Sequence, residues 1–377
     1  MSTASPAPFP HWMLREIHEQ PTTLAATLAH YVQGGQFHPA NCADIREWFA
    51  AVEGEIVIAA SGSSRHAGLV AELLIEDLGG IAVDVEYASE YCYRSEKSLK
   101  NAAVIVISQS GETADTLAAL RKAQTAGHQT LAVTNVPGSS MAVEASVSFP
   151  TLAGVERAIP ATKSFTAQLL VLHLIALLAA ESRNALDAAT IEKYLQHLTR
   201  LASVLDLQMA IWESQVSQVA RQYQSFKNFL FLGRGVHYAI AREGALKLKE
   251  SSYLHAEGYP GGELKHGPNA LVSDGTPLVM VATVDRSDPD AILRYEKILQ
   301  LMRDMKAQGA NIIAIANEGD HDIAALANVT VPVPELPESI LPIAEVIPLQ
   351  MLSYFMAINN DIDVDHPRNL TKAVVQE

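Results

Sequence analysis

The chain has 377 residues, of which 49% are hydrophobic and 18% are charged, and its formal net charge is −15. This length predicts two domains, and this composition is typical of a globular protein rather than a disordered one. The negative charge argues against nucleic acid and anionic membranes as partners, although a nest of backbone N–H groups can still bind a small anion.

The sequence shows no secretion or membrane signal. Cys42 and Cys92 are its only cysteines, which is too few for a disulfide framework and typical of a reducing compartment. The first residues lack a basic segment followed by an apolar one. The longest apolar run, 169–180, contains a histidine and is too short to span a bilayer. We therefore expect a cytoplasmic protein.

Strands alternate with helices in the first half of the chain. A helical pattern over 13–32, broken at Pro21, comes first. Strands are then predicted at 55–60, 82–87, 103–108, 130–135 and 147–149, with helices at 65–78 and from 114 to 125. This alternation predicts parallel strand pairing with right-handed crossovers.

A helical stretch separates this series from a second one. A mostly apolar helix is predicted over 162–181, followed by helices at 186–205 and 208–223. Strands are predicted again at 228–233, 277–282, 311–316 and 329–333, with helices ending at 251 and covering 291–307 and 340–358.

The two series match in spacing. Their first strands begin 173 residues apart, at 55 and 228, and the third strand of the first series begins 174 residues before its counterpart, at 103 and 277. This favours two tandem copies of one α/β unit, with a single large doubly wound sheet as the alternative. The predicted parts are an N-terminal tail and helices (1–40), a first domain (41–185), a helical connector (186–225), a second domain (226–360) and a C-terminal tail (361–377).

Two serine-rich turns follow predicted strands. Ligands of open parallel sheets bind at the carboxyl ends of the strands, which here directs attention to 61–64 (SGSS), 108–113 (SQSGET) and 233–237. Gly111 permits a tight turn, and the helix that follows adds N-terminal N–H groups. The side chains that offer hydrogen bonds are Ser64, Ser108, Gln109, Ser110 and Thr113. These turns predict a dianion site, and ordinary helix capping is the alternative.

Nucleotide motifs are missing. The sequence contains no G-x-x-x-x-G-K-[ST], and GRG at 233–235 lacks the third glycine of the dinucleotide fingerprint.

Acidic and basic residues are dense in 243–268. Glu243, Lys247 and Glu250 share one helical face, which is typical of a solvated salt-bridge ladder but also suits an acid–base site. A loop then follows that is rich in titratable groups, which suits general acid–base catalysis. A metal site is an alternative, but a tight two-ligand motif is missing and we predict no metal. The loop residues considered for it are His255, Glu257, Glu263 and His266.

The end of the chain, 363–377, is short and polar, and such ends are usually frayed. Pro367, Arg368 and Asn369 nevertheless indicate a defined turn just before Lys372. A lysine in a partly dry site can attack a carbonyl as a free amine. The chain by itself favours the interpretation as a tail.

Together these stretches resemble one enzyme family. The segments that carry the resemblance are SGSS, SQSGETADTLAALRKA, TNVPGSS, ATKSFT, FLGRGVHYAIAREGALKLKE, HAEGYPGGELKHGP and DVDHPRNLTKAVVQE. In order and spacing they are similar to the isomerase half of glutamine–fructose-6-phosphate aminotransferase (glucosamine-6-phosphate synthase), from residue 11 to residue 377. The resemblance implies two sugar isomerase (SIS) domains, each a parallel sheet flanked by helices in three layers.

The resemblance implies roles for individual residues. Glu250 is expected to move a proton between C1 and C2 of an open-chain sugar, and Lys372 to form an imine with the ketose. His266 is expected to open the ring from the neighbouring subunit of a homodimer, and Lys247 to support the site electrostatically. The sugar phosphate is expected to bind Ser64, Ser108, Gln109, Ser110 and Thr113, with backbone contacts from Ile159 and Thr371.

Two departures favour deamination over synthesis. The synthases begin with a glutaminase domain that carries a cysteine nucleophile, whereas about ten residues precede the match here. Ala161 also replaces the usual serine, and ATKSFT is more similar to stand-alone SIS-type glucosamine-6-phosphate deaminases. We therefore predict that the chain converts glucosamine 6-phosphate to fructose 6-phosphate and ammonia without a cofactor. The open alternatives are ammonia-dependent synthesis, a related isomerase or deglycase for another aminosugar phosphate, and a non-catalytic sugar-phosphate sensor.

Overall fold

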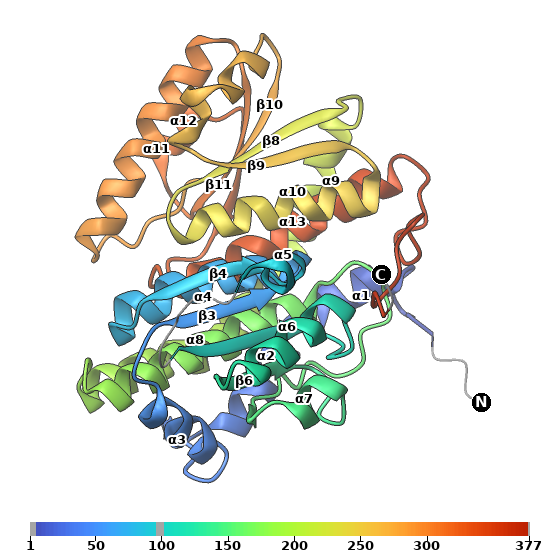
Figure 1. The fold of residues 1–377 in the computed structure, drawn as a ribbon. Coiled ribbons are helices and arrows are strands. Elements are labelled where there is room, and N and C mark those ends of the chain that lie inside the picture. The colour runs from blue at the N-terminus through green and yellow to red at the C-terminus, as the bar shows by residue number, and fades with distance from the viewer. Residues whose placement is uncertain (1–4, 96–101, 376–377) are drawn as a thin grey trace. The chain divides into compact units, whose positions relative to one another are not determined.

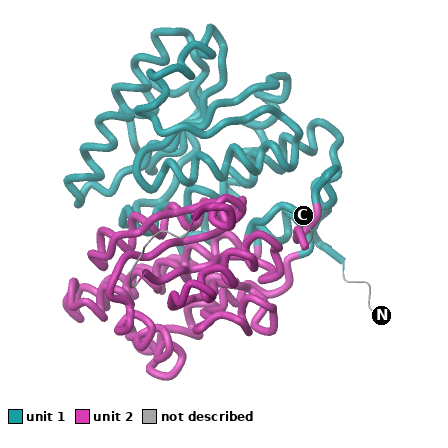
Figure 2. The backbone as a smooth tube through the Cα atoms, in the orientation of Figure 1, with its two compact units in different colours: residues 1–18, 157–162, 203–370 teal, residues 19–156, 163–202, 371–377 magenta. Residues whose placement is uncertain are grey.

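The computed structural model describes residues 5–95 and 102–375, which form two compact units (Figures 1 and 2). Unit 1 comprises residues 1–18, 157–162 and 203–370, and unit 2 comprises 19–156, 163–202 and 371–377. Within the described residues, each unit contains one five-stranded sheet. Neither unit is continuous in sequence, since the first helix belongs with the second sheet and the C-terminal residues belong with the first.

Unit 2 contains an all-parallel sheet in the order β4-β3-β5-β6-β7. Its strands are β3 (Ile56–Ala60), β4 (Val83–Tyr87), β5 (Ala103–Ser108), β6 (Gln129–Thr134) and β7 (Val147–Ser148). Its helices are α2 (Gln20–Tyr31), α3 (Ala43–Ala51), α4 (Gly62–Gly79), α5 (Ala88–Tyr93), α6 (Ala114–Thr125), α7 (Ser140–Glu144) and α8 (Lys163–Arg183). A short antiparallel pair, β1 (Val32–Gln33) with β2 (Gln36–Phe37), follows α2.

Alternate residues of the central strands face opposite helix layers in unit 2. Val57 and Val104 belong to a core cluster that includes Leu120 of α6. Ile58 and Ile107 point to the other face, where Gly68 lets α4 approach the sheet closely. The apolar runs of β3 and β5 are buried throughout, as expected for strands covered on both faces.

Unit 1 repeats this arrangement with the order β12-β11-β10-β8-β9, again all parallel. Its strands are β8 (Asn228–Gly233), β9 (His255–Pro260), β10 (Pro277–Val281), β11 (Asn311–Asn317) and β12 (Val329–Val333). Its helices are α1 (Trp12–His18), α10 (Val236–Ser252), α11 (Pro289–Ala307), α12 (His321–Leu326) and α13 (Leu341–Ile358), with 3₁₀ turns η1 (Glu263–His266) and η2 (Pro268–Leu271).

The identical strand order in the two units confirms the predicted tandem architecture and excludes one large sheet. The strand that corresponds to β4 is β9, which the sequence analysis placed in a loop. Gly258 and Pro260 weaken the strand pattern of β9, but hydrogen bonding with β8 overrides it. Gly258 is also required sterically, since a Cβ there would lie 2.7 Å from Arg242 Cα in α10.

Helix α9 differs from the prediction of two separate helices. The two helices predicted over 186–205 and 208–223 are one continuous helix, α9 (Ala188–Tyr223), because no proline or glycine interrupts that segment. Helices α8 and α13 are long and apolar enough to cross a membrane by length and composition alone, contrary to the expectation from the apolar run 169–180. Their apolar windows are 94% and 89% buried inside the protein, as in core helices.

Candidate functional site

The turns after β3 and β5 leave the same edge of the unit 2 sheet. The two strands pair in register, with Ala60 opposite Ile107, so the segments 61–64 and 108–113 emerge side by side. Ser61 precedes α4 and Ser64 lies in its first turn, whereas the hydroxyls of 108–113 precede α6, which confirms the predicted strand–turn–helix arrangement. The arrangement can hold an anion, because hydroxyls and helix N-terminal N–H groups both donate hydrogen bonds.

The three hydroxyls of the second turn form one cluster. Ser108 Oγ lies 2.9 Å from Thr113 Oγ1 and 3.5 Å from Ser110 Oγ. Ser108 Oγ also accepts a hydrogen bond from Gly111 N–H at 3.1 Å. Gln109, which lies between Ser108 and Ser110 in sequence, is half-buried. Its carbonyl accepts a hydrogen bond from Asn135 N–H. The predicted residues of this turn therefore lie together.

Gly111 and Glu112 fix the shape of this turn. Gly111 has φ +68°, and a Cβ there would lie 2.0 Å from Ser139 Oγ and 2.8 Å from Thr134 Oγ1. The Glu112 carboxylate accepts hydrogen bonds from Ser140 N–H at 2.7 Å and from Ser140 Oγ–H at 2.8 Å. The turn is thus tied to the segment that follows β6.

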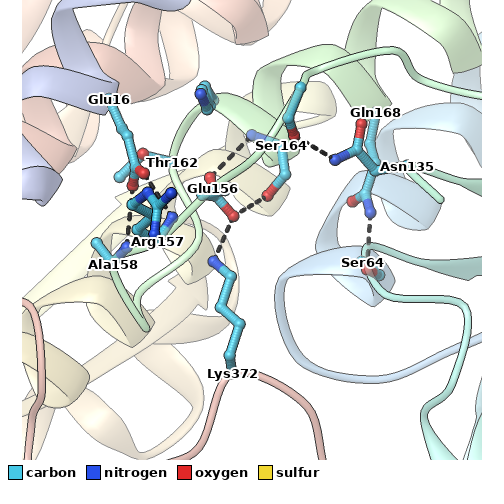
Figure 3. A network of polar contacts seen from close by, with 12 residues as sticks. Glu16, Ser64, Asn135, Glu156, Arg157, Ala158, Thr162, Ser164, Gln168 and Lys372 are labelled. Carbon is cyan, nitrogen blue, oxygen red and sulfur yellow. Dashed lines mark hydrogen bonds and ion pairs between the residues drawn. The ribbon is translucent and has the colours of Figure 1, made fainter. Parts of the chain in front are cut away.

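Ser64 lies in the first turn of α4, where its Oγ accepts a hydrogen bond from Gln168 Nε2 at 3.0 Å (Figure 3). Gln168 belongs to the buried helix α8, and its Oε1 has no hydrogen-bond partner. Gln168 was not predicted from the sequence, although a polar residue in a mostly apolar helix can indicate a functional contact.

A row of alternating charges lies on one face of α10 in unit 1. Lys247 Nζ lies 2.5 Å from Glu250 Oε2 and 3.4 Å from Glu243 Oε1. The side chains of Lys247 and Glu243 are 1% and 0% exposed, whereas that of Glu250 is 21% exposed. The shared face is confirmed, but its interpretation as a solvated ladder is wrong because two of the three members are buried. Glu250 is the member within reach of solvent.

The C-terminal segment around Lys372 is held in unit 2 and is not a frayed end. Its ammonium lies 2.5 Å from Glu156 Oε2, a fully buried carboxylate in unit 2 (Figure 3). Ser164 of the ATKS segment binds the same carboxylate through its N–H at 3.0 Å and its hydroxyl at 2.6 Å. Burial alone would raise the pKa of Glu156, but the charge of Lys372 and these hydrogen bonds lower it to about 2. Glu156 was not predicted from the sequence, where it and Arg157 form a charged pair among mostly apolar residues before ATKS.

The remaining predicted residues lie on backbone turns. Ile159 N–H donates to the carbonyl of Asp365 at 3.0 Å in unit 1. Thr371 is exposed, and its hydroxyl donates to the carbonyl of Ala373. The tail beyond it is anchored in unit 2, where Val374 O accepts a hydrogen bond from the N–H of Ala114, the first residue of α6.

His266 ends η1 and is exposed. Within residues 5–95 and 102–375, no group of three His, Cys, Asp or Glu side chains is arranged to hold a metal ion. His255 and Glu257 lie in β9, with Nε2 and Oε1 3.8 Å apart.

The equivalent edge of the unit 1 sheet holds an internal ion cluster. His237 Nδ1 lies 2.8 Å from Glu345 Oε1, and its Nε2 lies 3.2 Å from Glu338 Oε1. Arg294 binds Glu338 through two nitrogens at 2.8 and 2.9 Å. Burial opposes the charge of His237, but the two carboxylates outweigh it and raise its pKa to about 10. The turn at 233–237 therefore differs in chemistry from its hydroxyl-rich counterparts.

The predicted residues thus form two groups. The turns with Ser64, the Ser108 cluster and the Lys372–Glu156 pair belong to unit 2, whereas the Lys247–Glu250 pair, Ile159 and His266 belong to unit 1.

Comparisons with known proteins match the two-domain organisation of the chain. The model of the SIS domain matches residues 51–178 and 222–360. The glutamine–fructose-6-phosphate aminotransferase [isomerizing] of Clostridium acetobutylicum is 41% identical over 98% of this chain and 59% of its own length. The protein of the same name from Chlorobaculum tepidum is 40% identical with the same shares. The chain therefore spans about 59% of the length of these relatives.

Solved structures give the same picture. The C-terminal domain of glucosamine-fructose-6-phosphate aminotransferase from Francisella tularensis matches with a TM-score of 0.89 and 36% identity, covering 97% of this chain and 100% of that one. A glucosamine-6-phosphate deaminase from Thermotoga maritima shares the fold, with a TM-score of 0.72 and 23% identity over 96% of this chain and 99% of that one. The chain therefore belongs to the SIS-domain family.

Proposed function

We propose that the chain is a phosphosugar isomerase that converts glucosamine 6-phosphate to fructose 6-phosphate and ammonia. The observation that carries this proposal is the buried Glu243–Lys247–Glu250 row, which presents one carboxylate toward solvent. An aldose–ketose interconversion needs such a base to move a proton between neighbouring carbons.

The phosphate would bind the turns of unit 2. Ser108, Ser110 and Thr113 supply three clustered hydroxyls before α6, and Ser64 supplies one more at α4. Gln109 adds an amide. Hydroxyl and backbone donors suit a phosphate, because they bind the dianion without a permanent positive charge.

Ring opening would come first, assisted by His266 from the neighbouring subunit of a homodimer. Glu250 would then take the proton from C2 of the open-chain aminosugar and deliver it to C1. This converts the C1 aldehyde to an alcohol and the C2 ammonium to an iminium, with one N–H proton passing to the C1 oxygen. Lys247 would orient Glu250 and support the site electrostatically through its 2.5 Å contact.

Release of ammonia would complete the reaction. Lys372, as a free amine, would attack C2 of the iminium and expel ammonia, and water would then hydrolyse the lysine imine to fructose 6-phosphate. Glu156 would hold Lys372 in place through their ion pair, and solvent water would take the proton that frees the amine. Ile159 and Thr371 would contribute backbone contacts, and no metal or other cofactor is required for these steps.

Synthesis from fructose 6-phosphate and ammonia is the second candidate. It uses the same steps in reverse, and it is favoured by relatives with 40–41% identity that are named aminotransferases. Deamination is favoured by Ala161 and the ATKSFT segment. We place the protein in the cytoplasm.

A product assay tests the proposal. Glucosamine 6-phosphate and galactosamine 6-phosphate are each incubated with the purified chain, and ammonia and ketose phosphate are measured. The reverse reaction is run with fructose 6-phosphate and ammonium. We expect deamination of glucosamine 6-phosphate, with turnover lost by about 10²–10⁴-fold in Glu250→Gln but retained in Glu257→Gln, which changes an acid of β9.

Each contrary result has a definite meaning. Turnover in the reverse direction alone selects synthesis, and turnover of galactosamine 6-phosphate alone selects another aminosugar. Binding without turnover in either direction selects a sensor and refutes the enzymatic proposal.

A further inference from the structure

The Asp365 carboxylate joins the C-terminal segment to the start of the chain. It accepts hydrogen bonds from the N–H groups of Trp12 at 2.9 Å and Met13 at 2.8 Å, at the beginning of α1. Its own carbonyl accepts the N–H of Ile159. Asp365 is 7% exposed and precedes Lys372 by seven residues. All of these contacts lie within unit 1.

The Glu16 carboxylate makes a matching connection from the middle of α1. It accepts the N–H groups of Arg157 at 2.5 Å and Ala158 at 3.2 Å (Figure 3). Glu16 is 1% exposed. Arg157 and Ala158 directly follow Glu156, the partner of Lys372. One short helix therefore engages both segments that lead to the Glu156–Lys372 pair.

Both contacts use the two oxygens of one carboxyl group as acceptors. A carboxylate has two oxygens that accept, so it satisfies two backbone donors at once. The corresponding amide accepts through one oxygen and would turn an NH₂ group toward the second N–H. Leaving a buried donor unsatisfied is costly, so an amide would displace the backbone it contacts. Burying a carboxyl group is costly, so apolar side chains would fill these positions if packing were their only role.

We propose that Glu16 and Asp365 are positioning residues that hold the segments carrying Glu156 and Lys372, and thereby place the Lys372 amine for attack on the sugar carbon. This rests on the proposed function in one respect, that Lys372 forms the imine. Neither residue is expected to contact the sugar. Displacing a reacting group by about 1 Å can reduce rate roughly 100-fold, so small backbone shifts matter.

The test uses Glu16→Gln and Asp365→Asn in the purified chain. Borohydride trapping with saturating fructose 6-phosphate is followed by mass at Lys372, together with kcat, KM and the melting temperature. We expect trapping and kcat to fall roughly 10- to 100-fold and KM to change less than about twofold. Asp365→Glu retains both acceptor oxygens and should restore trapping to within about threefold of the original protein.

Asp320→Asn is the matched control. Asp320 is also 7% exposed and accepts a backbone N–H, that of Ile323 at 3.0 Å, together with the Tyr295 hydroxyl. We expect this variant to lower the melting temperature without slowing trapping. If Glu16→Gln and Asp365→Asn behave as this control does, their role is structural only and the proposal is overturned.

A second measurement separates this proposal from the proposed function. Limited reductive methylation with formaldehyde reports the accessibility of Lys372 without any sugar, with Lys265 as an internal reference. We expect methylation of Lys372 to rise several-fold in both variants, because its ion pair loosens. If the original protein yields no sugar adduct, the imine step fails, and unchanged methylation of Lys372 in the variants would independently overturn the positioning role.

Discussion

Glu156 and Lys372 lie 216 residues apart in the chain, and their side chains form an ion pair of 2.5 Å in unit 2. The pair brings the polar C-terminal tail into the same unit as the hydroxyl-rich turns. The carboxylate is fully buried, whereas the Lys372 side chain is 27% exposed. The Lys372 side chain is therefore partly accessible to solvent, whereas the carboxylate that pairs with it is shielded from water.

Replacing Glu156 tests whether this pair has a chemical role. Glu156→Gln removes the ion pair that orients Lys372, so kcat should fall by about 10²-fold. Steady-state kinetics measure the effect. The control is Glu181→Gln, which breaks an ion pair with Arg46 of 2.7 Å that is more exposed. Equal kcat in the original protein and Glu156→Gln would remove Glu156 from the mechanism.

The same carboxylate predicts a pH dependence of stability on the acid side. Its pKa is lowered from 4.5 to about 2 in the folded chain, so its contribution is present above pH 4.5 and is lost as pH falls toward 2. The contribution is roughly 3 kcal/mol. Denaturant unfolding of the original protein and Glu156→Gln should show a difference at pH 6 that shrinks by pH 3. A constant difference would contradict the assigned charge state.

His237 predicts the opposite dependence on the alkaline side. Its pKa is raised from 6.5 to about 10, so the folded chain retains a proton that the unfolded chain releases. The stabilisation is fully present below pH 6.5 and is lost as pH rises through 10. The free energy of unfolding should decline from pH 7 to pH 9.5 in the original protein and more gently in His237→Gln. Parallel profiles would show that the imidazole is neutral.

Gly111→Ala tests the phosphate turn. The added Cβ would meet Ser139 Oγ at 2.0 Å in a backbone of φ +68°, so the turn must open and sugar-phosphate affinity should fall at least tenfold. Gly127→Ala is the matched control, because it has φ +80° but no atom within 4 Å of the new Cβ. Titration calorimetry with fructose 6-phosphate measures both. Unchanged affinity in Gly111→Ala would show that the sugar phosphate does not bind at this turn.

Local patterns were sufficient for much of the fold. The buried runs of β3, β5 and β8 and the turns that follow them are encoded in contiguous residues, because strand burial and turn chemistry are short-range properties. The repeated spacing predicted the duplication for the same reason. Strand β9 escaped notice, since its hydrogen bonding to β8 and not its composition makes it a strand.

The sequence by itself determined the two α/β units, the hydroxyl turns and the shared face of Glu243, Lys247 and Glu250, because each depends on periodicity within one segment. Only the tertiary structure decided that this face is buried, that Lys372 is paired with Glu156, and that α1 engages Asp365. These contacts join residues more than a hundred positions apart, or depend on which neighbours exclude water. Neither is visible in a local pattern, since burial and long-range pairing arise only when the chain folds upon itself.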